Sequence, residues 1–461
     1  MTSPIRRSIA LASLVVATLL TAAVGAVDAA GQSTYILVAG RRLPYLYAIS
    51  LDAALDPAND QTSNAIVGRS KVALDRLDGR PLGDPANLVV SEDGRTVYVV
   101  NHHGAIDNAE FNQHGGRGQV AVLDVDAVLD PANDRTANAL VRHMDSGGFG
   151  ALGVVLLPDM LILGGAENHL TEDGGNRITF VDRRTGSLRH TVELALGSPG
   201  FECQDYPVPY VAPYGPPRDL AVLSPDPGWG CFPDPNGLAL GQTGDGRRFL
   251  FSANGGTGDV SVIDLAQALE GDPLAEIARI PTQVAPWGIA ATPSGRHVIV
   301  ANGGSQRERR SGNTLSIIDV DRASTGAADA EVARVLVGTD NPEEQTHPLI
   351  VSVTPDGAEV VVPNIRTNNV SIVDMDRALA GDPGAEVARI PLARNDGRIA
   401  RPKGSAITSD GRYAVISAGP RSEPLSEEPG HVYVIDLRSR TVVATVTGVG
   451  NDPYGVALVY R

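Results

Sequence analysis

Lysine is nearly absent from this chain of 461 residues, which contains only Lys71 and Lys403. The 38 basic residues are outnumbered by 54 acidic ones, for a formal charge of −16. Non-specific binding to nucleic acid or to an anionic membrane surface depends on basic patches, so this balance argues against both. Aromatic residues are also scarce, at 4%, whereas there are 51 glycines and 32 prolines. Glycine and proline mark turns, so the composition favours many short strands over long helices.

Long apolar runs are absent except at the N-terminus. There Arg6 and Arg7 precede an apolar stretch, Ser8–Val27, that ends in small residues. This pattern predicts a signal peptide over residues 1–29, and hence export to the periplasm or the cell exterior by the Sec route. A twin-arginine signal and an uncleaved membrane anchor are the alternatives. No later stretch is long and apolar enough to span a bilayer, so we expect no span in the mature chain.

The only two cysteines, Cys203 and Cys231, fall within an irregular segment rich in proline and tyrosine, residues 197–233. The prolines exclude a regular helix or a central strand there. An exported protein meets an oxidising environment, so we expect the two cysteines to form a disulfide that constrains this segment. A free catalytic thiol is the alternative.

One sequence phrase recurs along the chain after the N-terminal segment. It consists of a Ser/Thr-x-Asp-Gly turn or a close variant, an apolar strand, a loop, and a second strand that ends in aspartate. Glycine in such a turn adopts positive φ at little cost, and alternating apolar residues have the period of a strand, so the phrase predicts a hairpin. Copies occupy residues 91–126, 156–182, 243–265, 292–321, 354–376 and 408–437.

A further strand precedes each hairpin and in most copies begins with proline followed by small residues, which suit the crowded centre of a ring. The chain ends with such a strand, residues 452–460, that has no hairpin after it. It begins with a hairpin, residues 33–52, that has no strand before it. Pairing the two completes a seventh blade and removes the open sheet edge. Residues 30–461 are therefore predicted to form an all-β, seven-bladed β-propeller of four-stranded blades.

The connectors that follow the third strands also repeat. Residues 52–67 are similar to residues 126–141, and residues 264–281 are similar to residues 374–391. Each connector is predicted to hold a short helical turn and a proline-led return to the outer strand. Their Asp and Asn clusters are typical of turns. Ca²⁺ binding is the alternative, although no complete spacing of oxygen ligands occurs.

The strand phrases VSVIDL, LSIIDVD, VSIVDMD and VYVIDL, paired with strands that end in Asn or Ala-Asn, resemble the YVTN family of β-propeller repeats. The resemblance covers nearly the whole mature chain. That family is similar to the lactonase-type and the haem-d1 nitrite-reductase-type seven-bladed propellers, so the resemblance implies the fold. It supplies no catalytic motif that can be placed on residues of this chain, because propellers serve many chemistries.

In a propeller, the lead into each innermost strand and the loop after each second strand lie on one face. Mixed charge at the lead-ins of this chain favours a site for a small polar ligand at the mouth of the central tunnel, where Arg401 and Lys403 would hold a carboxylate or a phosphate. The alternative is that these residues cap strands and pair with nearby aspartates. The candidate ligand-binding residues are Asp84, Asp234, Trp287, His347, Arg401, Lys403 and Tyr454.

Two long loops after second strands, residues 101–118 and 164–176, carry histidines and carboxylates in neighbouring blades. Imidazole and carboxylate groups bind divalent metals, and the same groups serve as general acids and bases. Ordinary polar loop residues are the alternative, and no H-E-x-x-H signature occurs. The candidate metal ligands are His102, His103, His114, Glu167 and His169.

Three classes of function follow. The first is a binding or interaction scaffold for a small polar ligand or an extracytoplasmic protein. The second is an enzyme on the same face, a lactonase-like hydrolase or a polysaccharide lyase, with or without a divalent metal. The third is a cofactor-bearing electron-transfer protein, in which any haem would be held non-covalently because C-x-x-C-H is absent. Closed sheet edges predict a monomer, while the cofactor and the catalytic residues stay unassigned.

Overall fold

The computed structural model describes residues 32–73, 76–77, 80–81, 84–102, 117–166, 168–169, 173–195, 233–304, 312–394, 396–420 and 425–461. The predicted signal peptide and the predicted Cys203–Cys231 disulfide lie outside these ranges. Within them, no helix has the length and apolar character needed to cross a bilayer.

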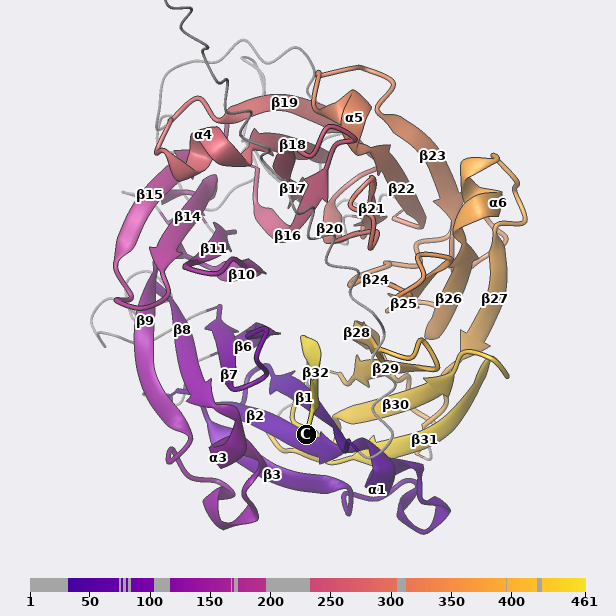
Figure 1. Ribbon diagram of the computed structural model, residues 1–461. Helices are drawn as coiled ribbons and strands as arrows, with labels where there is room; N and C mark the ends of the chain where they lie inside the picture. The colour runs from indigo at the N-terminus through magenta and orange to yellow at the C-terminus, as the bar shows by residue number, and fades with distance from the viewer. Residues whose placement is uncertain are drawn as a thin grey trace, which may run out of the picture.

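The described residues form seven four-stranded antiparallel sheets that stand as blades around a central axis, so the predicted seven-bladed β-propeller is confirmed (Figure 1). From the axis outward, blade 1 contains β32 (Val456–Tyr460), β1 (Thr34–Gly40), β2 (Tyr45–Ser50) and β3 (Ile66–Lys71). In the same order, blade 2 contains β6 (Pro85–Val90), β7 (Thr96–Asn101), β8 (Arg117–Asp124) and β9 (Leu140–Phe149); blade 3, β10 (Ala151–Leu156), β11 (Met160–Gly165), β14 (Arg177–Asp182) and β15 (Leu188–Glu193); and blade 4, β16 (Pro235–Gln242), β17 (Arg248–Asn254), β18 (Asp259–Asp264) and β19 (Glu276–Pro281). Blade 5 contains β20 (Pro286–Ala291), β21 (His297–Asn302), β22 (Thr314–Asp319) and β23 (Glu331–Leu336); blade 6, β24 (Ser352–Val353), β25 (Glu359–Asn364), β26 (Asn369–Asp374) and β27 (Glu386–Pro391); and blade 7, β28 (Pro402–Ile407), β29 (Tyr413–Ala418), β30 (His431–Asp436) and β31 (Thr441–Thr447).

Two small hairpins and several one-turn helices complete the described structure. The hairpins pair β4 (Arg76–Leu77) with β5 (Arg80–Pro81) and β12 (Asn168–His169) with β13 (Asp173–Gly174). The helices are α1 (Leu51–Leu55), α3 (Val125–Leu129), α4 (Leu265–Leu269), α5 (Val320–Ala323) and α6 (Met375–Leu379), with 3₁₀ turns η1 (Pro57–Asn59) and η2 (Pro131–Asn133).

The ring closes by pairing the two ends of the chain, as predicted. Strand β1 pairs antiparallel with β2 on one side and with β32 on the other, and Val38 lies opposite Val456. Two backbone hydrogen bonds between Ser33 and Arg461, of 2.7 and 2.9 Å, extend the pairing. Strand β1 therefore has no open edge on which another chain could add.

The hydrophobic core lies between the blades rather than at the axis. Side chains alternate across a strand, so Leu37 and Ala39 of β1 pack in a cluster shared with blade 2, whereas Ile36 and Val38 pack against blade 7. All four are fully buried. Burial of one such side chain contributes about 1.5–3 kcal/mol, so the alternating apolar pattern fixes both the register and the stacking of blades.

The innermost strands approach each other so closely that several positions accept only glycine. A Cβ atom on Gly404 of blade 7 would lie 1.9 Å from the backbone oxygen of Tyr454 in blade 1, and one on Gly288 would lie 2.0 Å from that of Leu349. The recurring Pro-x-Gly at the start of these strands is therefore a packing requirement of the axis. Blade 6 lacks this glycine; its backbone at Ile350 bonds to the Lys403 oxygen (3.2 Å), and β24 is correspondingly shorter than the predicted strand.

In blades 2, 4, 5 and 6 the aspartate that ends the third strand caps the helix after it. The Asp264 side chain accepts a hydrogen bond from the Gln267 backbone (3.1 Å), and that of Asp374 accepts one from Arg377 (2.9 Å). The two similar connectors at residues 52–67 and 126–141 also form hydrogen bonds to the outer strand of the preceding blade. Residue Gln61 donates its backbone N–H to the Thr445 oxygen of blade 7 (2.8 Å), so this connector ties blade 1 to the outer strand of the preceding blade.

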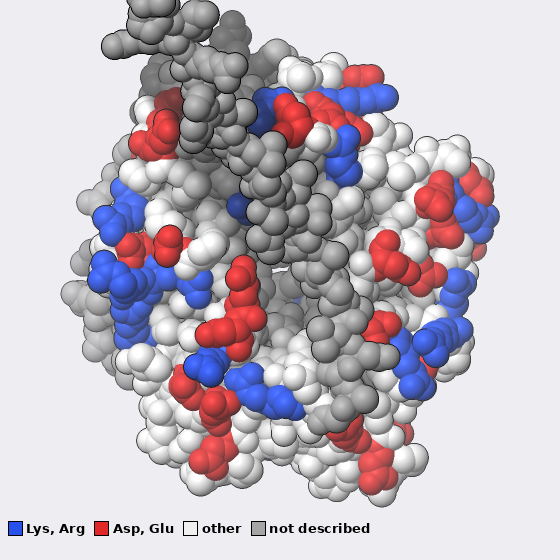
Figure 2. All heavy atoms as spheres, in the orientation of Figure 1, with Lys and Arg blue, Asp and Glu red and all other residues white. Residues whose placement is uncertain are grey.

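Antiparallel strands place the residues before first strands and those after second strands at one end of the ring, called here the top face. The helices follow third strands and so lie at the other end. In the view of Figure 2, acidic and basic side chains lie beside one another around the periphery of the ring, without a large patch of one sign.

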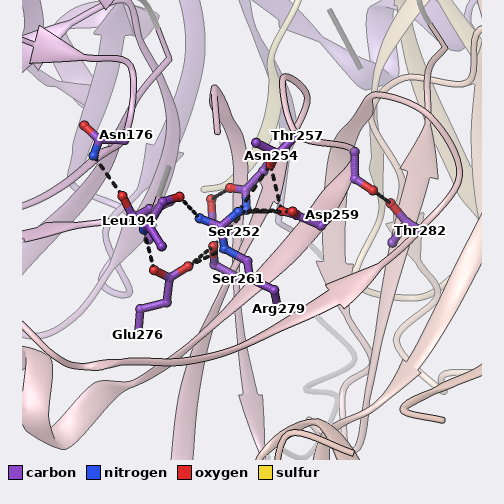
Figure 3. A network of polar contacts seen from close by, with 12 residues as sticks. Asn176, Leu194, Ser252, Asn254, Thr257, Asp259, Ser261, Glu276, Arg279 and Thr282 are labelled. Atoms are coloured by element: carbon purple, nitrogen blue, oxygen red, sulfur yellow. Dashed lines mark hydrogen bonds and ion pairs between the residues drawn. The ribbon is translucent and has the colours of Figure 1, made fainter. Parts of the chain in front are cut away.

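A buried polar network joins blades 3 and 4 (Figure 3). The Arg279 guanidinium binds Asp259 (Nη1 to Oδ1, 2.9 Å) and Glu276 (Nε to Oε1, 2.5 Å), and all three side chains are fully buried. Glu276 accepts the Ala195 backbone N–H (2.7 Å), and Arg279 donates to the Ala195 oxygen (2.5 Å). The network thus holds the end of blade 3 against blade 4, and burial raises the pKa of Asp259 while Arg279 opposes the rise.

The same Glu-x-Ala-Arg sequence occurs in blades 5 and 6 in a more open setting. The side chain of Arg334 is 42% exposed beside Glu331, and that of Arg389 is 30% exposed beside Glu386. Identical sequence therefore gives a buried ion pair in one blade and a solvated one in the next, because the neighbouring blade decides the burial.

Arg279→Ala is expected to destabilise the protein by roughly 3–5 kcal/mol, because it leaves Asp259 and Glu276 buried without a cation. Arg334→Ala removes the matched solvated pair and is expected to cost at most about 1 kcal/mol. Urea or guanidinium unfolding of the two variants checks this. Asp259→Asn in the Arg279→Ala background should recover part of the loss, since Asn369 occupies the equivalent position in blade 6. Equal losses for the two arginine variants would contradict the assignment.

Candidate functional site

The tunnel mouth on the top face begins with a rim of seven equivalent residues, one from each blade. In five blades the rim residue directly precedes the innermost strand, and in blades 6 and 1 it lies a few residues before that strand. Six of the seven rim residues adopt left-handed backbone angles, with φ between 52° and 68°. In blades 2 to 7 the rim carbonyl accepts a hydrogen bond from the residue that follows the second strand, such as Gly255 N to Asp234 O at 3.0 Å. The rim residues are Asp84, Gly150, Asp234, Ala285, His347, Arg401 and Asp452.

The left-handed angles are unusual because five of the six residues carry a Cβ atom and precede proline. Such conformations cost roughly 1–3 kcal/mol each and persist only where the surrounding structure enforces them. Strain of this kind clusters at binding and catalytic sites. The repeated rim conformation therefore marks this end of the tunnel as a candidate site.

A second ring of residues, two positions further along, forms a floor beneath the rim. Its members are Ala86, Leu152, Asn236, Trp287, Leu349, Lys403 and Tyr454. The Trp287 side chain of blade 5 packs against Ala86 and Leu152 of blades 2 and 3, and also against Leu349 and Tyr454 of blades 6 and 1. Trp287 therefore reaches across the tunnel and gives the mouth an apolar floor.

Two of the three rim aspartates are already neutralised. Asp84 binds Arg41 (Oδ2 to Nε, 2.9 Å), and Asp452 binds Lys403 (Oδ1 to Nζ, 2.7 Å), with all four side chains at most 13% exposed. Tyr454 lies between the two pairs, with Arg41 4.7 Å and Lys403 5.6 Å from its ring centre. Burial works to lower the pKa of Arg41, but the charges of Asp84, Tyr454 and Asp452 outweigh it and raise the pKa.

Arg401 differs from Arg41 and Lys403, the other cations at the mouth, because its side chain has no partner among the described residues. Its Nε atom is buried and forms no hydrogen bond, and among described arginines that are not exposed it alone has neither an ion pair nor a side-chain hydrogen bond. Lys403, by contrast, is held by Asp452 and by the backbone oxygens of Arg401 and Gly419. Of the two cations that the sequence suggested as anion ligands, the structure leaves Arg401 available and commits Lys403.

His347 sits beside Arg401 on the rim and is 7% exposed. Burial lowers its pKa to about 4, and the positive charges of Arg366, Arg401 and Lys403 lower it further, while a contact with the Gly303 backbone opposes the shift. The imidazole is therefore uncharged at neutral pH. It can accept or donate a hydrogen bond without adding positive charge to the mouth.

The predicted metal site is tested only in part. His102 is 6% exposed, and its Nδ1 lies 3.3 Å from the Ala151 oxygen, as expected for a histidine that bonds to backbone. His103, His114 and Glu167 lie outside the described residues, as does the side chain of His169. Among the side chains that the structure describes, no three His, Cys, Asp or Glu residues form a metal-sized group. The metal site stays a prediction.

Sequence reasoning did not single out Arg41 or Arg366, although both contribute charge to the mouth. Arg41 directly follows β1, the second strand of the composite blade, so it is equivalent to His102 in blade 2. Aligning the seven blades by their second strands would have identified Arg41 as a residue at the tunnel mouth. Arg366 lies in the short turn between β25 and β26. Functional residues were expected in long loops, so this turn was not considered.

Comparisons with known proteins support the fold. No family model matches the chain and no curated protein does, so the YVTN resemblance stays a prediction. The periplasmic gluconolactonase of Pseudomonas aeruginosa superposes with a TM-score of 0.57 at 15% identity, over 93% of this chain and 99% of that one. A putative 6-phosphogluconolactonase from Bacteroides uniformis gives 0.55 at 13% identity over 93% and 99%. A protein of unknown function from Desulfotomaculum acetoxidans gives 0.54 at 15% over 92% and 98%. At these identities the likeness shows the propeller fold alone.

His347→Gln is expected to reduce the loss of stability on acidification. Imidazole titrates near pH 6.5 in an unfolded chain but at about 4 in this fold, so the unfolded state binds its proton first as the pH falls. The contribution of His347 is fully present above about pH 6.5 and is lost by about pH 4, a change of about 3 kcal/mol. Urea unfolding at pH 7 and pH 4.5 measures it. His190→Gln on β15, away from the rim, is the control. An unchanged pH dependence in His347→Gln would contradict burial of an uncharged imidazole.

Proposed function

We propose that this protein binds a small polar ligand at the tunnel mouth on its top face. The observation that carries the proposal is Arg401, a rim cation whose buried Nε has no partner among the described residues, while the rim carboxylates of Asp84 and Asp452 are paired with Arg41 and Lys403. A buried donor without an acceptor costs free energy in the unliganded protein, and a ligand that supplies the acceptor recovers it. A signal peptide at residues 1–29 would place this binding scaffold outside the cytoplasm.

The mouth combines the elements of a small-molecule site. Trp287 provides an apolar floor that is partly exposed, and such floors are the usual base of a ligand pocket. The rim supplies a cation at Arg401, an uncharged imidazole at His347 and a carboxylate at Asp234. Few polar groups at fixed positions around an apolar base are what orient a small ligand.

Ligand binding is expected to change the fluorescence of Trp287. The chain has two tryptophans, so Trp229→Phe leaves Trp287 as the single reporter. Small carboxylates, phosphorylated compounds and uncharged polyols would be screened against this variant. A ligand that binds at the mouth should lose about tenfold or more in affinity in Arg401→Met, because a charge-assisted hydrogen bond is worth about 1.5–3 kcal/mol.

Arg398→Met is the matched control for that experiment. Arg398 is three residues away, is exposed, and its side chain forms no hydrogen bond or ion pair with the described residues, although its charge acts on nearby Asp396. Its loss should leave the affinity unchanged. Ligands whose affinity falls equally in both variants would bind through general charge, and a screen in which no compound perturbs Trp287 would argue against the site.

A lactonase-like hydrolase is the second candidate, favoured by His347. An uncharged, buried imidazole next to an unpaired guanidinium could take a proton from water as it attacks a lactone carbonyl, while Arg401 stabilises the oxyanion. The ring C–O bond then breaks and the leaving alkoxide takes the proton back. The gluconolactonase among the structural neighbours shares the fold, which makes an aldonolactone the first substrate to assay.

Lactone hydrolysis above the spontaneous rate, followed by titration of the released acid, tests the enzyme hypothesis. His347→Gln should reduce the catalysed rate by about 100-fold or more, the usual contribution of a general base. His190→Gln should leave it unchanged. Binding at the mouth without hydrolysis of any lactone would leave the binding scaffold as the function.

A further inference from the structure

Two buried donor atoms without acceptors occur close together on the top face, where blades 6 and 7 meet. They are Nε of Arg401 and Oγ1 of Thr367. Nearly all buried polar groups in folded proteins have a partner, so each exception calls for an explanation. Thr367 lies in the turn between β25 and β26, and Arg401 lies on the adjacent rim. We call His347, Arg366, Thr367 and Arg401 the basic corner.

Asn368 fixes the two halves of the basic corner to each other. Its Oδ1 accepts hydrogen bonds from the backbone N–H groups of Ala400 (2.6 Å) and Arg401 (3.1 Å). Its Nδ2 donates to the Leu392 oxygen (2.6 Å). The next residue of the same turn toward the N-terminus is Thr367, so the turn that carries Thr367 and Arg366 is tied to the rim position that carries Arg401.

The backbone around the basic corner is held rigidly from blade 6 as well. Ile365 donates to the His347 oxygen (3.1 Å) and Arg366 donates to the Thr346 oxygen (3.0 Å). Left-handed angles at His347, Asn368 and Arg401, with φ of 55°, 58° and 56°, complete the frame. The backbone positions that carry the donors are therefore fixed, which reduces the conformational entropy that a ligand must overcome.

Within the part of the chain that the structure describes, no carboxylate balances the positive charge of the basic corner. Neither Arg366 nor Arg401 has a carboxylate partner in the described part of the chain. The nearby rim carboxylates of Asp84 and Asp452 are occupied by Arg41 and Lys403. In a protein whose formal charge is −16, the described residues thus supply no carboxylate to two guanidinium groups at one point of the tunnel mouth.

We propose that the basic corner binds an oxyanion, the carboxylate or phosphate group of a small ligand, through the guanidinium groups of Arg366 and Arg401 and the hydroxyl of Thr367. This inference rests on the proposed function and names the chemistry of the ligand that the mouth takes. Guanidinium groups match the paired oxygens of carboxylate and phosphate, and the Thr367 hydroxyl supplies a further donor. Lys403 takes no part, because Asp452 holds it, and Asn368 is a positioning residue.

Titration with inorganic phosphate and with acetate, each at constant ionic strength, tests the proposal. Trp287 fluorescence of the Trp229→Phe protein reports binding, and chloride serves as the anion without the oxygens. The two arms distinguish a phosphate site from a carboxylate site. We expect one of the two oxyanions to saturate, with an affinity at least tenfold lower in Arg401→Gln and about threefold to tenfold lower in Arg366→Gln and in Thr367→Val. Arg398→Gln should bind like the parent protein.

A second measurement guards against variants that merely misfold. Thr367→Val removes a buried hydroxyl that has no partner, so without anion its unfolding temperature should equal or exceed that of the parent. Added oxyanion should raise the unfolding temperature of the parent but not that of Arg401→Gln. Oxyanion binding that is unaffected by Arg366→Gln and Thr367→Val, or weakened equally by Arg398→Gln, would overturn the proposal.

The outcomes also separate this inference from the proposed function. Uncharged polar ligands that perturb Trp287 while phosphate and acetate do not would retain a ligand site at the mouth and reject the oxyanion site. Failure of every ligand class to perturb Trp287, with no oxyanion effect on the unfolding temperature, would reject both.

Discussion

The close approach of the innermost strands at the axis is the constraint on which the rest of the structure depends. Where Gly404 faces the backbone of Tyr454 at a distance that excludes a Cβ atom, the two blades can meet only through glycine. The Pro-x-Gly sequence repeats for this reason. Its middle residue is left free to vary, and because it occupies the same position in every blade, the seven middle residues form one layer across the tunnel. The floor of the mouth, including Trp287, is a direct consequence of that packing.

The rim residues also occupy one equivalent position in each blade, and together they form a charged site. A proline follows the rim residue in every blade except blade 3, and a hydrogen bond to the rim carbonyl occurs in blades 2 to 7, so the blades differ mainly in the rim side chain. Aspartates in blades 1 and 2 are matched by Lys403 and Arg41, and small residues stand at Gly150 and Ala285. The described rim residues therefore differ between blades through a few side chains, and Arg401 is a rim charge without an ion pair among the described residues.

The fold could be predicted from the sequence because local sequence patterns determine it. The hairpin phrase, the proline-led strands and the unmatched strands at the two ends predict seven blades and their closure. Sequence reasoning allowed Lys403 to pair with a nearby aspartate but did not identify which one, since Lys403 and Asp452 meet only because ring closure brings blade 7 against blade 1. The basic corner was missed for a different reason. Sites were expected in long loops, whereas Arg366, Thr367 and Asn368 occupy a four-residue turn. This turn forms a candidate site only because Arg401 of the next blade lies against it.

Long-range and short-range electrostatics act in opposite directions at this site. A formal charge of −16 repels an anion at a distance, but at physiological salt this field decays over about 8 Å, whereas a guanidinium in contact with an oxyanion is little screened. Affinity for an anion must then come almost entirely from groups that touch it. That requirement explains why the useful feature of the mouth is the absence of a carboxylate beside Arg401 rather than an accumulation of basic residues. Among the described residues, Arg41 and Lys403 are paired with aspartates, whereas Arg366 and Arg401 at the basic corner have no carboxylate partner.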